Sequence, residues 1–160
     1  MLISSSAFEE NEDIPVEYTC DGEGMSPPLS FEDVPEEARS LTLVVDDPDA
    51  PAGTFTHWVL WNINPDVEEI EEGEVPPGAR QGVNSSGGTG YTPPCPLSGV
   101  HRYIFNLYAL DKTLDLPSSS SKEELEEEMG GSIIAQTSLT GLYGHMDDDG
   151  GLQDSGDFGI

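Results

Sequence analysis

Residues 41–62 read LTLVVDDPDAPAGTFTHWVLWN, and this stretch decides the fold that we expect for the chain. Its two ends, residues 41–45 and 58–61, are short runs of mainly aliphatic or aromatic side chains, a pattern typical of buried strands. The segment between them contains Pro48 and Pro51, which have no amide donor and cannot continue a strand ladder. A stiff, carboxylate-bearing loop would therefore join two core strands. A loop on such a rigid scaffold can carry function, although a solvated acidic loop is the plainer interpretation.

The composition limits the partners that the chain can have. Its 160 residues include 32 acidic and 5 basic side chains, which gives a formal charge of −27. A surface of this charge repels nucleic acids and anionic membranes, so we expect neither as a partner. Apolar runs recur through the chain, so a packed core in one domain is expected rather than disorder. The excess of acid with only two lysines is typical of a protein from a salt-loving microbe, where ions screen the self-repulsion.

The termini and the cysteines point to a cytoplasmic protein. The first fifteen residues carry four acidic side chains and lack the basic and apolar regions of a signal peptide. There is no run of about 18 apolar residues that could span a membrane. Cys20 and Cys95 are too few for a disulfide framework and lack the partners of a zinc site, while one disulfide between them stays open. We expect no metal and no cofactor.

Hydrophobic periodicity along the rest of the chain predicts a mainly β fold. Further strands are expected at residues 2–8, 14–19, 29–31, 101–110 and 132–142, and residues 65–78 and 81–90 are expected to be loops. A helix is predicted at residues 122–130, where serines precede an acidic first turn and Gly130 ends the pattern. Without a βαβ repeat, the sheet should be mainly antiparallel. We expect a domain at residues 1–145 and a disordered, acidic and glycine-rich tail at residues 146–160.

Two histidines stand near the beginning of strong strands, although a single histidine in such a place is more often structural. If the ends of these strands meet at one edge of a sheet, Asp47, His57, His101 and Tyr103 come together. Imidazoles, a phenol and a carboxylate suit a small oxyanion that carries a proton or an attached amine. We expect the surrounding carboxylates to raise the pKa of both imidazoles, because they favour the charged form.

Several motifs in matching order resemble the phosphatidylethanolamine-binding protein family. The strongest are DPDAP at residues 47–51, HWVLWN at residues 57–62 and GVHRYIFNLYALD at residues 99–111. Three more are YTCDGEGMSPPL at residues 18–29, QGVNSSGGTGYTPPCP at residues 81–96 and LTGLYG at residues 139–144. The resemblance spans roughly residues 2–145 and is strongest to the bacterial and archaeal branch, often called Raf kinase inhibitor-like.

The resemblance implies a large antiparallel sheet with a smaller sheet, one or two short helices and a small anion pocket at one end. The pocket residues that it implies are Asp47, Asp49, His57, Pro94, His101 and Tyr103. Both histidines would donate to the anion, and Asp47 would orient an imidazole or accept from the ligand. Strand alternation turns Arg102 away from the pocket, so we expect it in an ion pair. Thr92 and Pro93 stand where relatives commonly have glycines, which predicts a narrower mouth.

Three functions compete for this chain. The one we favour is non-enzymatic binding of a small anionic or phosphorylated ligand, by a protein that we expect to be a homodimer. The alternative is a protease or signalling inhibitor that acts through surface loops. A hydrolase that uses Asp47, His57 and His101 is less favoured, because no serine or cysteine is identifiably placed as a nucleophile, although Cys95 is near in sequence.

The charge predicts that salt stabilises the fold. Raising potassium chloride from about 0.1 M to about 1 M shortens the Debye length from about 10 Å to about 3 Å and should weaken the repulsion between surface carboxylates. We therefore expect the melting temperature, followed by circular dichroism, to rise over this range. A melting temperature that does not change with salt would contradict a salt-loving source.

Overall fold

The computed structural model describes residues 1–145, and the tail predicted at residues 146–160 lies outside them. The described part of the chain is mainly β, as predicted, with two sheets, one α-helix and a short 3₁₀ turn at Val16–Tyr18. In chain order, the elements are β1 (Leu2–Ser4), β2 (Glu12–Asp13), β3 (Leu29–Glu32), β4 (Ser40–Asp47), β5 (Phe55–Ile63), β6 (Glu69–Ile70), β7 (Arg80–Gln81), β8 (Gly99–Leu110), α1 (Lys122–Met129) and β9 (Ile133–His145).

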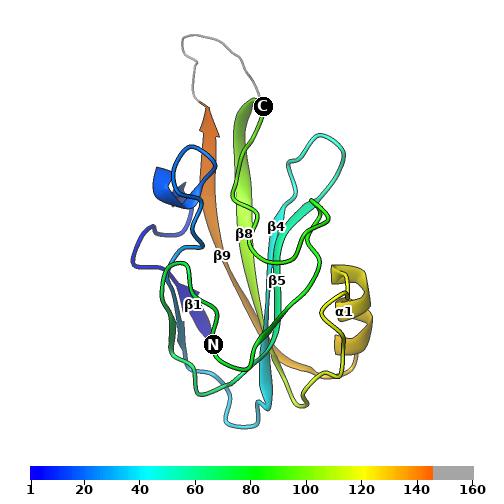
Figure 1. The fold of residues 1–160 in the computed structure, drawn as a ribbon. Helices are drawn as coiled ribbons and strands as arrows, with labels where there is room; N and C mark the ends of the chain where they lie inside the picture. The colour runs from blue at the N-terminus through cyan, green and yellow to red at the C-terminus, as the bar shows by residue number, and fades with distance from the viewer. Residues whose placement is uncertain (146–160) are drawn as a thin grey trace.

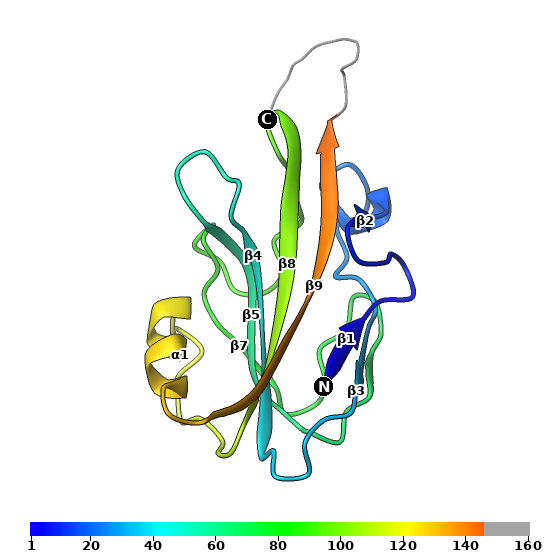
Figure 2. The ribbon, with the colours of Figure 1, turned by 180° about the vertical axis from the view of Figure 1, so that it is seen from behind.

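The large sheet runs between α1 on one side and the small sheet on the other (Figures 1 and 2). Its strand order is β2-β9-β8-β4-β5-β7, and the small sheet has the order β1-β3-β6. Neighbouring strands are antiparallel except for β2, which pairs in parallel with β9. The strand predicted from residues 41–45 is therefore the centre of the fold, since β4 has β5 and β8 as neighbours.

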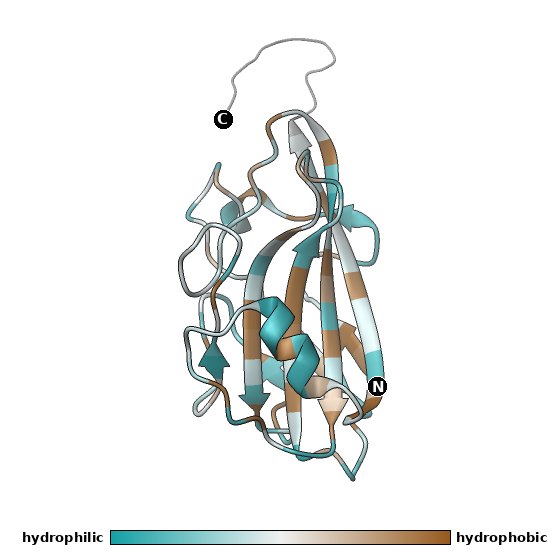
Figure 3. Cartoon of the chain, turned by 90° about the vertical axis from the view of Figure 1, so that its right-hand side faces the viewer, coloured by the Kyte–Doolittle hydropathy of each residue, from teal (hydrophilic) through white to brown (hydrophobic). Residues whose placement is uncertain are grey.

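Strand alternation divides the apolar residues of the large sheet between two cores. Leu43 and Val45 of β4 pack in the core that includes Phe31 of the small sheet. Val44, which points to the opposite face, packs in a second core with Leu125 of α1. Because both faces of β4 are covered, its sequence is a nearly continuous apolar run. Figure 3 shows α1 lying across this second face, with hydrophilic residues over most of the helix.

The helix begins and ends where its sequence predicts. The Ser121 hydroxyl accepts the amide hydrogen of Glu124, and the Glu124 carboxylate accepts the amide hydrogen of Ser121, which is a reciprocal capping box. Leu125 and Met129, four positions apart, are buried against the sheet, and Gly130 follows the last turn. In residues 1–145, no helix has the length and apolar character needed to cross a membrane.

The prediction of a strand at residues 14–19 is wrong. The chain makes a 3₁₀ turn there, in which the Tyr18 amide donates to the Pro15 carbonyl oxygen. The Thr19 hydroxyl and amide both donate to the Val16 carbonyl oxygen and close the turn. As a result Tyr18 is buried whereas Val16 is 50% exposed, so the apolar–polar alternation does not come from a sheet face. The two-residue strands β6 and β7 also occur where only loops were predicted; segments this short carry no periodicity.

A disulfide joins Cys20 to Cys95, which answers a question that the sequence left open. It links the loop after the 3₁₀ turn to the loop before β8, across 75 positions of the chain. The link is reinforced by the Cys20 amide, which donates to the Pro94 carbonyl oxygen over 3.1 Å. Both cysteines are exposed, so a reductant can reach the bond.

Removing this disulfide should destabilise the protein. In the chain-entropy view, a cross-link across a long loop restricts the unfolded chain and typically contributes about 2–4 kcal/mol. We expect the double variant Cys20→Ser, Cys95→Ser to lose about this much free energy of unfolding in urea titrations. Wild-type protein titrated with dithiothreitol present is the matched control and should lose a similar amount. Unchanged midpoints in both samples would contradict this prediction.

Candidate functional site

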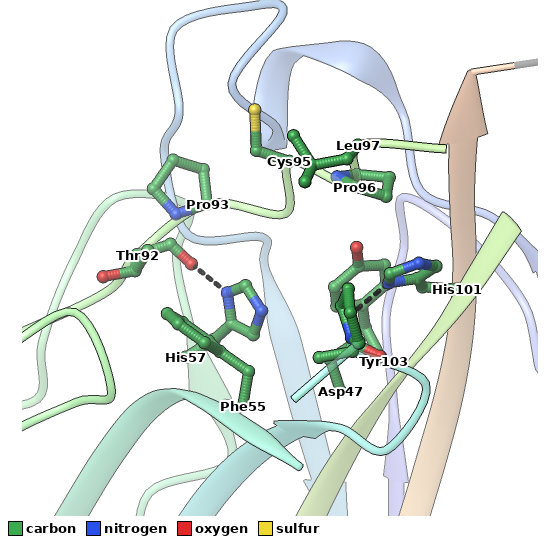
Figure 4. Close-up of a pocket in the computed structure, with 12 residues that line it drawn as sticks. Asp47, Phe55, His57, Thr92, Pro93, Cys95, Pro96, Leu97, His101 and Tyr103 are labelled. Carbon is green, nitrogen blue, oxygen red and sulfur yellow. Dashed lines mark hydrogen bonds and ion pairs between the residues drawn. The ribbon is translucent and has the colours of Figure 1, made fainter. Parts of the chain in front are cut away.

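The ends of β4, β5 and β8 meet at one end of the large sheet, as the sequence predicted. Asp47 is the last residue of β4, His57 lies near the start of β5, and His101 and Tyr103 lie near the start of β8. On β8, alternation places both side chains on the face that carries the larger core. The four side chains line one pocket, which Figure 4 shows with the imidazole of His57 on one side and that of His101 on the other.

A β-bulge turns His57 into this pocket. Val45 of β4 pairs with Trp58, but the next residue, Asp46, pairs with Thr56, so β5 has one extra residue at His57. A bulge of this kind places two consecutive side chains on the same side of the sheet. His57 therefore lies on the side of Trp58 and the larger core, instead of facing α1. The sequence gives no signal for this extra residue.

The Asp47 carboxylate holds two parts of the site in place. Its Oδ1 accepts the amide hydrogen of Asp49 over 2.8 Å, which shapes the turn after β4. Its Oδ2 lies 2.6 Å from Nδ1 of His101. The side chain is only 5% exposed, so these bonds replace the water that a carboxylate would otherwise bind. Asp47 thus fixes both the turn and the orientation of the His101 ring.

His57 is fastened to the loop that forms the opposite wall. Its Nδ1 donates to the Thr92 carbonyl oxygen over 2.6 Å, and the Thr92 amide donates back to the His57 carbonyl oxygen over 2.9 Å. Burial lowers the pKa of His57, and the Thr92 carbonyl, Asp47 and Asp46 only partly oppose this effect. The expectation that the pKa of this imidazole is raised is therefore wrong, because desolvation outweighs the effect of the nearby carboxylates.

Tyr103 completes the polar base of the pocket, which we define as Asp47, His57, His101 and Tyr103. Its ring meets His57 edge-on at a centroid distance of 5.3 Å and stacks with His101 at 6.4 Å. Burial, followed by the charge of Asp47, raises the pKa of Tyr103 well above its usual range. The hydroxyl therefore stays protonated at neutral pH and can donate to a ligand.

Apolar side chains form the walls above this base. They enclose a cavity of about 260 Å³ and are Ala50, Pro51, Phe55, Pro93, Pro96 and Leu97, together with Thr92 and Cys95. Phe55 was not predicted to belong to the site, although it pairs with Asp47 across the β4–β5 hairpin and contacts His57 at a ring distance of 4.8 Å. Thr92 and Pro93, expected to narrow the mouth, both lie in the wall.

Two of the six expected site residues lie beside the pocket without lining it. Asp49 accepts three hydrogen bonds from Arg102: from its amide, from Nε and from Nη2, at 2.9, 3.0 and 2.9 Å. These bonds lower the pKa of Asp49 to about 2. Pro94 is buried and uses its carbonyl oxygen to accept from Cys20. The ion pair expected for Arg102 is present, and its partner is Asp49.

The described residues contain no group of three or more histidine, cysteine, aspartate or glutamate side chains that is placed to share a metal ion. Within the pocket, Asp47 and His101 bond to each other, and Nδ1 of His57 is used by Thr92. Cys95 is part of a disulfide and offers no thiol nucleophile.

Asp49 should contribute more to stability than Arg102, although they form one pair. An exposed ion pair contributes up to about 1 kcal/mol, but Asp49→Ala also leaves the Arg102 amide without its acceptor. We expect Arg102→Ala to lower the free energy of unfolding slightly and Asp49→Ala to lower it further, in urea titrations at neutral pH.

The pH dependence of stability provides a second test of the ion pair between Asp49 and Arg102. Because the folded-state pKa of Asp49 is lowered to about 2 from a usual 3.8, its contribution is complete above 3.8 and is lost as the pH falls towards 2. The difference between wild type and Asp49→Ala should shrink over that range. Equal losses in the two single variants at neutral pH would show that the backbone bond adds nothing.

Comparison with known proteins agrees with this architecture. Residues 4–144 match the family described as phosphatidylethanolamine-binding protein. A UPF0098 protein of Methanothermobacter thermautotrophicus is 52% identical over 89% of this chain and 98% of its own length. A putative phosphatidylethanolamine-binding protein homologue of Chlamydia trachomatis has a crystal structure with a TM-score of 0.87 and 46% identity, covering 89% of this chain and 96% of that one.

The structure of Escherichia coli YbcL, titled a new member of the mammalian family, matches with a TM-score of 0.83 and 29% identity over 89% of this chain and 97% of its own. Nothing in these matches bears on a salt-loving source, which stays a prediction. The family match, the close relatives and the shared fold lead to one conclusion: the chain belongs to the phosphatidylethanolamine-binding protein family.

Proposed function

We propose that the chain binds a small anionic or phosphorylated ligand in the pocket, and that it does so without catalysing a reaction. The observation that carries this proposal is the convergence of two imidazoles, a phenol and a carboxylate at the base of an otherwise apolar cavity. A few polar groups in an apolar recess are typical of a small-molecule site. The volume of about 260 Å³ suits a head group or a small metabolite better than a large ligand.

The apolar walls favour a ligand with an apolar part attached to its charged end. The charged end would lie against the polar base, where the Tyr103 hydroxyl and Nε2 of His101 can reach it. The attached group would lie between Pro51, Phe55 and the wall segment that ends at Leu97. Phosphate monoesters and similar oxyacids have this arrangement.

The alternative is inhibition of a protease or a signalling protein through the loops around the pocket. One observation favours it: Leu97 and Val100, at the wall and at the start of β8, are 58% and 45% exposed. Exposed apolar side chains beside a recess are a common feature of protein contact surfaces. The homodimer and the cytoplasmic location stay predictions that neither the pocket nor the similar proteins test.

His101→Ala should weaken anion binding, and it should also lower stability because it leaves one oxygen of the buried Asp47 carboxylate without its partner, so affinity is measured where the variant is folded. The variant loses an imidazole that can donate Nε2–H to a bound oxyanion, and a hydrogen bond to a charged group contributes about 1.5–3 kcal/mol. We therefore expect calorimetric affinity for inorganic phosphate, measured at about pH 6, to fall roughly ten- to hundredfold.

Tyr108→Phe is the matched control, because it changes an aromatic ring on the same strand at the end far from the pocket. Its phosphate affinity should equal that of the wild type. Unchanged phosphate affinity in His101→Ala would remove this residue from the site.

A further inference from the structure

Both imidazoles of the pocket use their Nδ1 hydrogen within the protein. Nδ1 of His57 lies 2.6 Å from the carbonyl oxygen of Thr92, which can only accept, so this nitrogen carries the hydrogen. Nδ1 of His101 lies 2.6 Å from a carboxylate oxygen of Asp47, which likewise accepts. A neutral imidazole has one N–H. In the neutral state, the Nε2 atom of each ring therefore has a lone pair and accepts a hydrogen bond instead of donating one.

The accepting role of Nε2 matters most for His57. It is only 5% exposed, and burial lowers its pKa, so the neutral, accepting form is favoured. Figure 4 shows Nδ1 directed at Thr92 and the second ring nitrogen on the side of Asp47 and Tyr103. None of the hydrogen bonds found in residues 1–145 uses this second nitrogen, and it faces the cavity that the ring lines.

The acidic groups around the two rings disfavour an anion in the same way as the accepting Nε2 atoms do. The charges of Asp46 and Asp47 on β4 act on His57, which also lies near His101 and contacts the Tyr103 ring on β8. His101 lies near Asp47, Asp49, Arg102 and Tyr103, and Tyr143 of β9 is its partner in register. Lys122 pairs with Asp46 and Arg102 pairs with Asp49, whereas Asp47 pairs, within residues 1–145, with the imidazole of His101 and with no lysine or arginine. A fully ionised anion would therefore meet lone pairs and an acidic surrounding.

A ligand that brings its own hydrogen resolves this conflict. Resting on the function proposed above, we propose that the pocket selects oxyacids that keep one acidic proton, such as the singly ionised form of a phosphate monoester, whose hydroxyl donates to Nε2 of His57. The hydroxyl of Tyr103 then donates to an ionised oxygen of the same ligand, as does His101 when its ring is protonated. The pocket would bind a protonated oxyacid and reject a permanently ionised one of the same shape.

Methyl phosphate and methyl sulfate test this selectivity on the wild-type protein. Singly ionised methyl phosphate and methyl sulfate have the same charge and nearly the same shape, and differ in one hydroxyl hydrogen. At pH 6, near the second pKa of a phosphate monoester at about 6, we expect methyl phosphate to bind about ten- to hundredfold more tightly. The reason is that bound methyl sulfate would cover the acceptor on His57 without offering it a hydrogen.

Proton uptake gives an independent readout. At a pH of about 7.5, a phosphate monoester is mostly doubly ionised in solution, so binding of its singly ionised form must take up a proton. Calorimetry in two buffers of different ionisation enthalpy measures this uptake. We expect about one more proton for each methyl phosphate bound than for each methyl sulfate bound, and any proton taken up by His101 cancels in the difference.

His57→Phe should abolish the selectivity, because phenylalanine keeps a ring between Phe55 and Tyr103 but has no acceptor. The ratio of the two affinities should fall towards one. Tyr91→Phe is the matched control: it also removes a donor to a backbone carbonyl, that of Tyr18, but does not line the cavity. Its ratio should remain that of the wild type.

The outcomes separate the two proposals. Equal affinities of the wild type for methyl phosphate and methyl sulfate, with equal proton uptake, would overturn the selectivity and leave the anion-binding function standing. Binding of neither compound at millimolar concentration would overturn the anion-binding function itself. Because the wild-type comparison decides both questions, neither depends on whether His57→Phe folds.

Discussion

The carboxylate of Asp47 is the interaction on which the rest of the pocket depends. A buried carboxylate is costly unless its oxygens are hydrogen-bonded, and both oxygens of Asp47 have protein donors. One bond closes the turn after β4, and the other holds the ring of His101, which stacks with Tyr103. The position of the loop and the positions of two rings that line the pocket are therefore consequences of one group placed at the end of the central strand.

Much of this arrangement could be predicted from the sequence because strand periodicity and strand ends are local signals. The two halves of residues 41–62 and the strand after Gly99 are strongly apolar, so the meeting of Asp47, His57, His101 and Tyr103 at one edge follows once the strands are antiparallel. The roles of the two loop aspartates could not be separated in this way. Asp47 and Asp49 differ by two positions in a proline-stiffened loop, and only the folded chain brings Arg102 to Asp49.

Other features depended on information that local patterns do not contain. The bulge at His57 is a property of how β5 pairs with β4, and the burial that lowers the pKa of this imidazole depends on the Thr92 loop. The segment from Ile14 to Thr19 has the alternation of a strand, but Pro15 and the Thr19 hydroxyl favour a turn. The disulfide joins loops that are far apart in the chain, and the position of the two cysteines in sequence does not reveal their proximity.

Because the chain has few cationic side chains, the positions of these side chains are informative. The chain has 5 basic side chains, and two of them pair with the aspartates on either side of Asp47: Lys122 with Asp46 and Arg102 with Asp49. These pairs partly neutralise the neighbours of a carboxylate that is itself committed to His101. In so acidic a protein, two of the few cations thus offset the charge of two aspartates beside the pocket, and the acidic character of Asp47 remains.

The fastening of the Thr92–Leu97 wall also has a consequence for the speed of binding. This segment is held by reciprocal bonds to His57, by the Cys20 amide on Pro94 and by the disulfide at Cys95. A wall held at three points is expected to move little, so the proposed ligand would enter a recess that is already shaped. Without a gating step, the residence time of a ligand would be set by the strength of its contacts with the base, and exchange would be rapid for any weakly held compound.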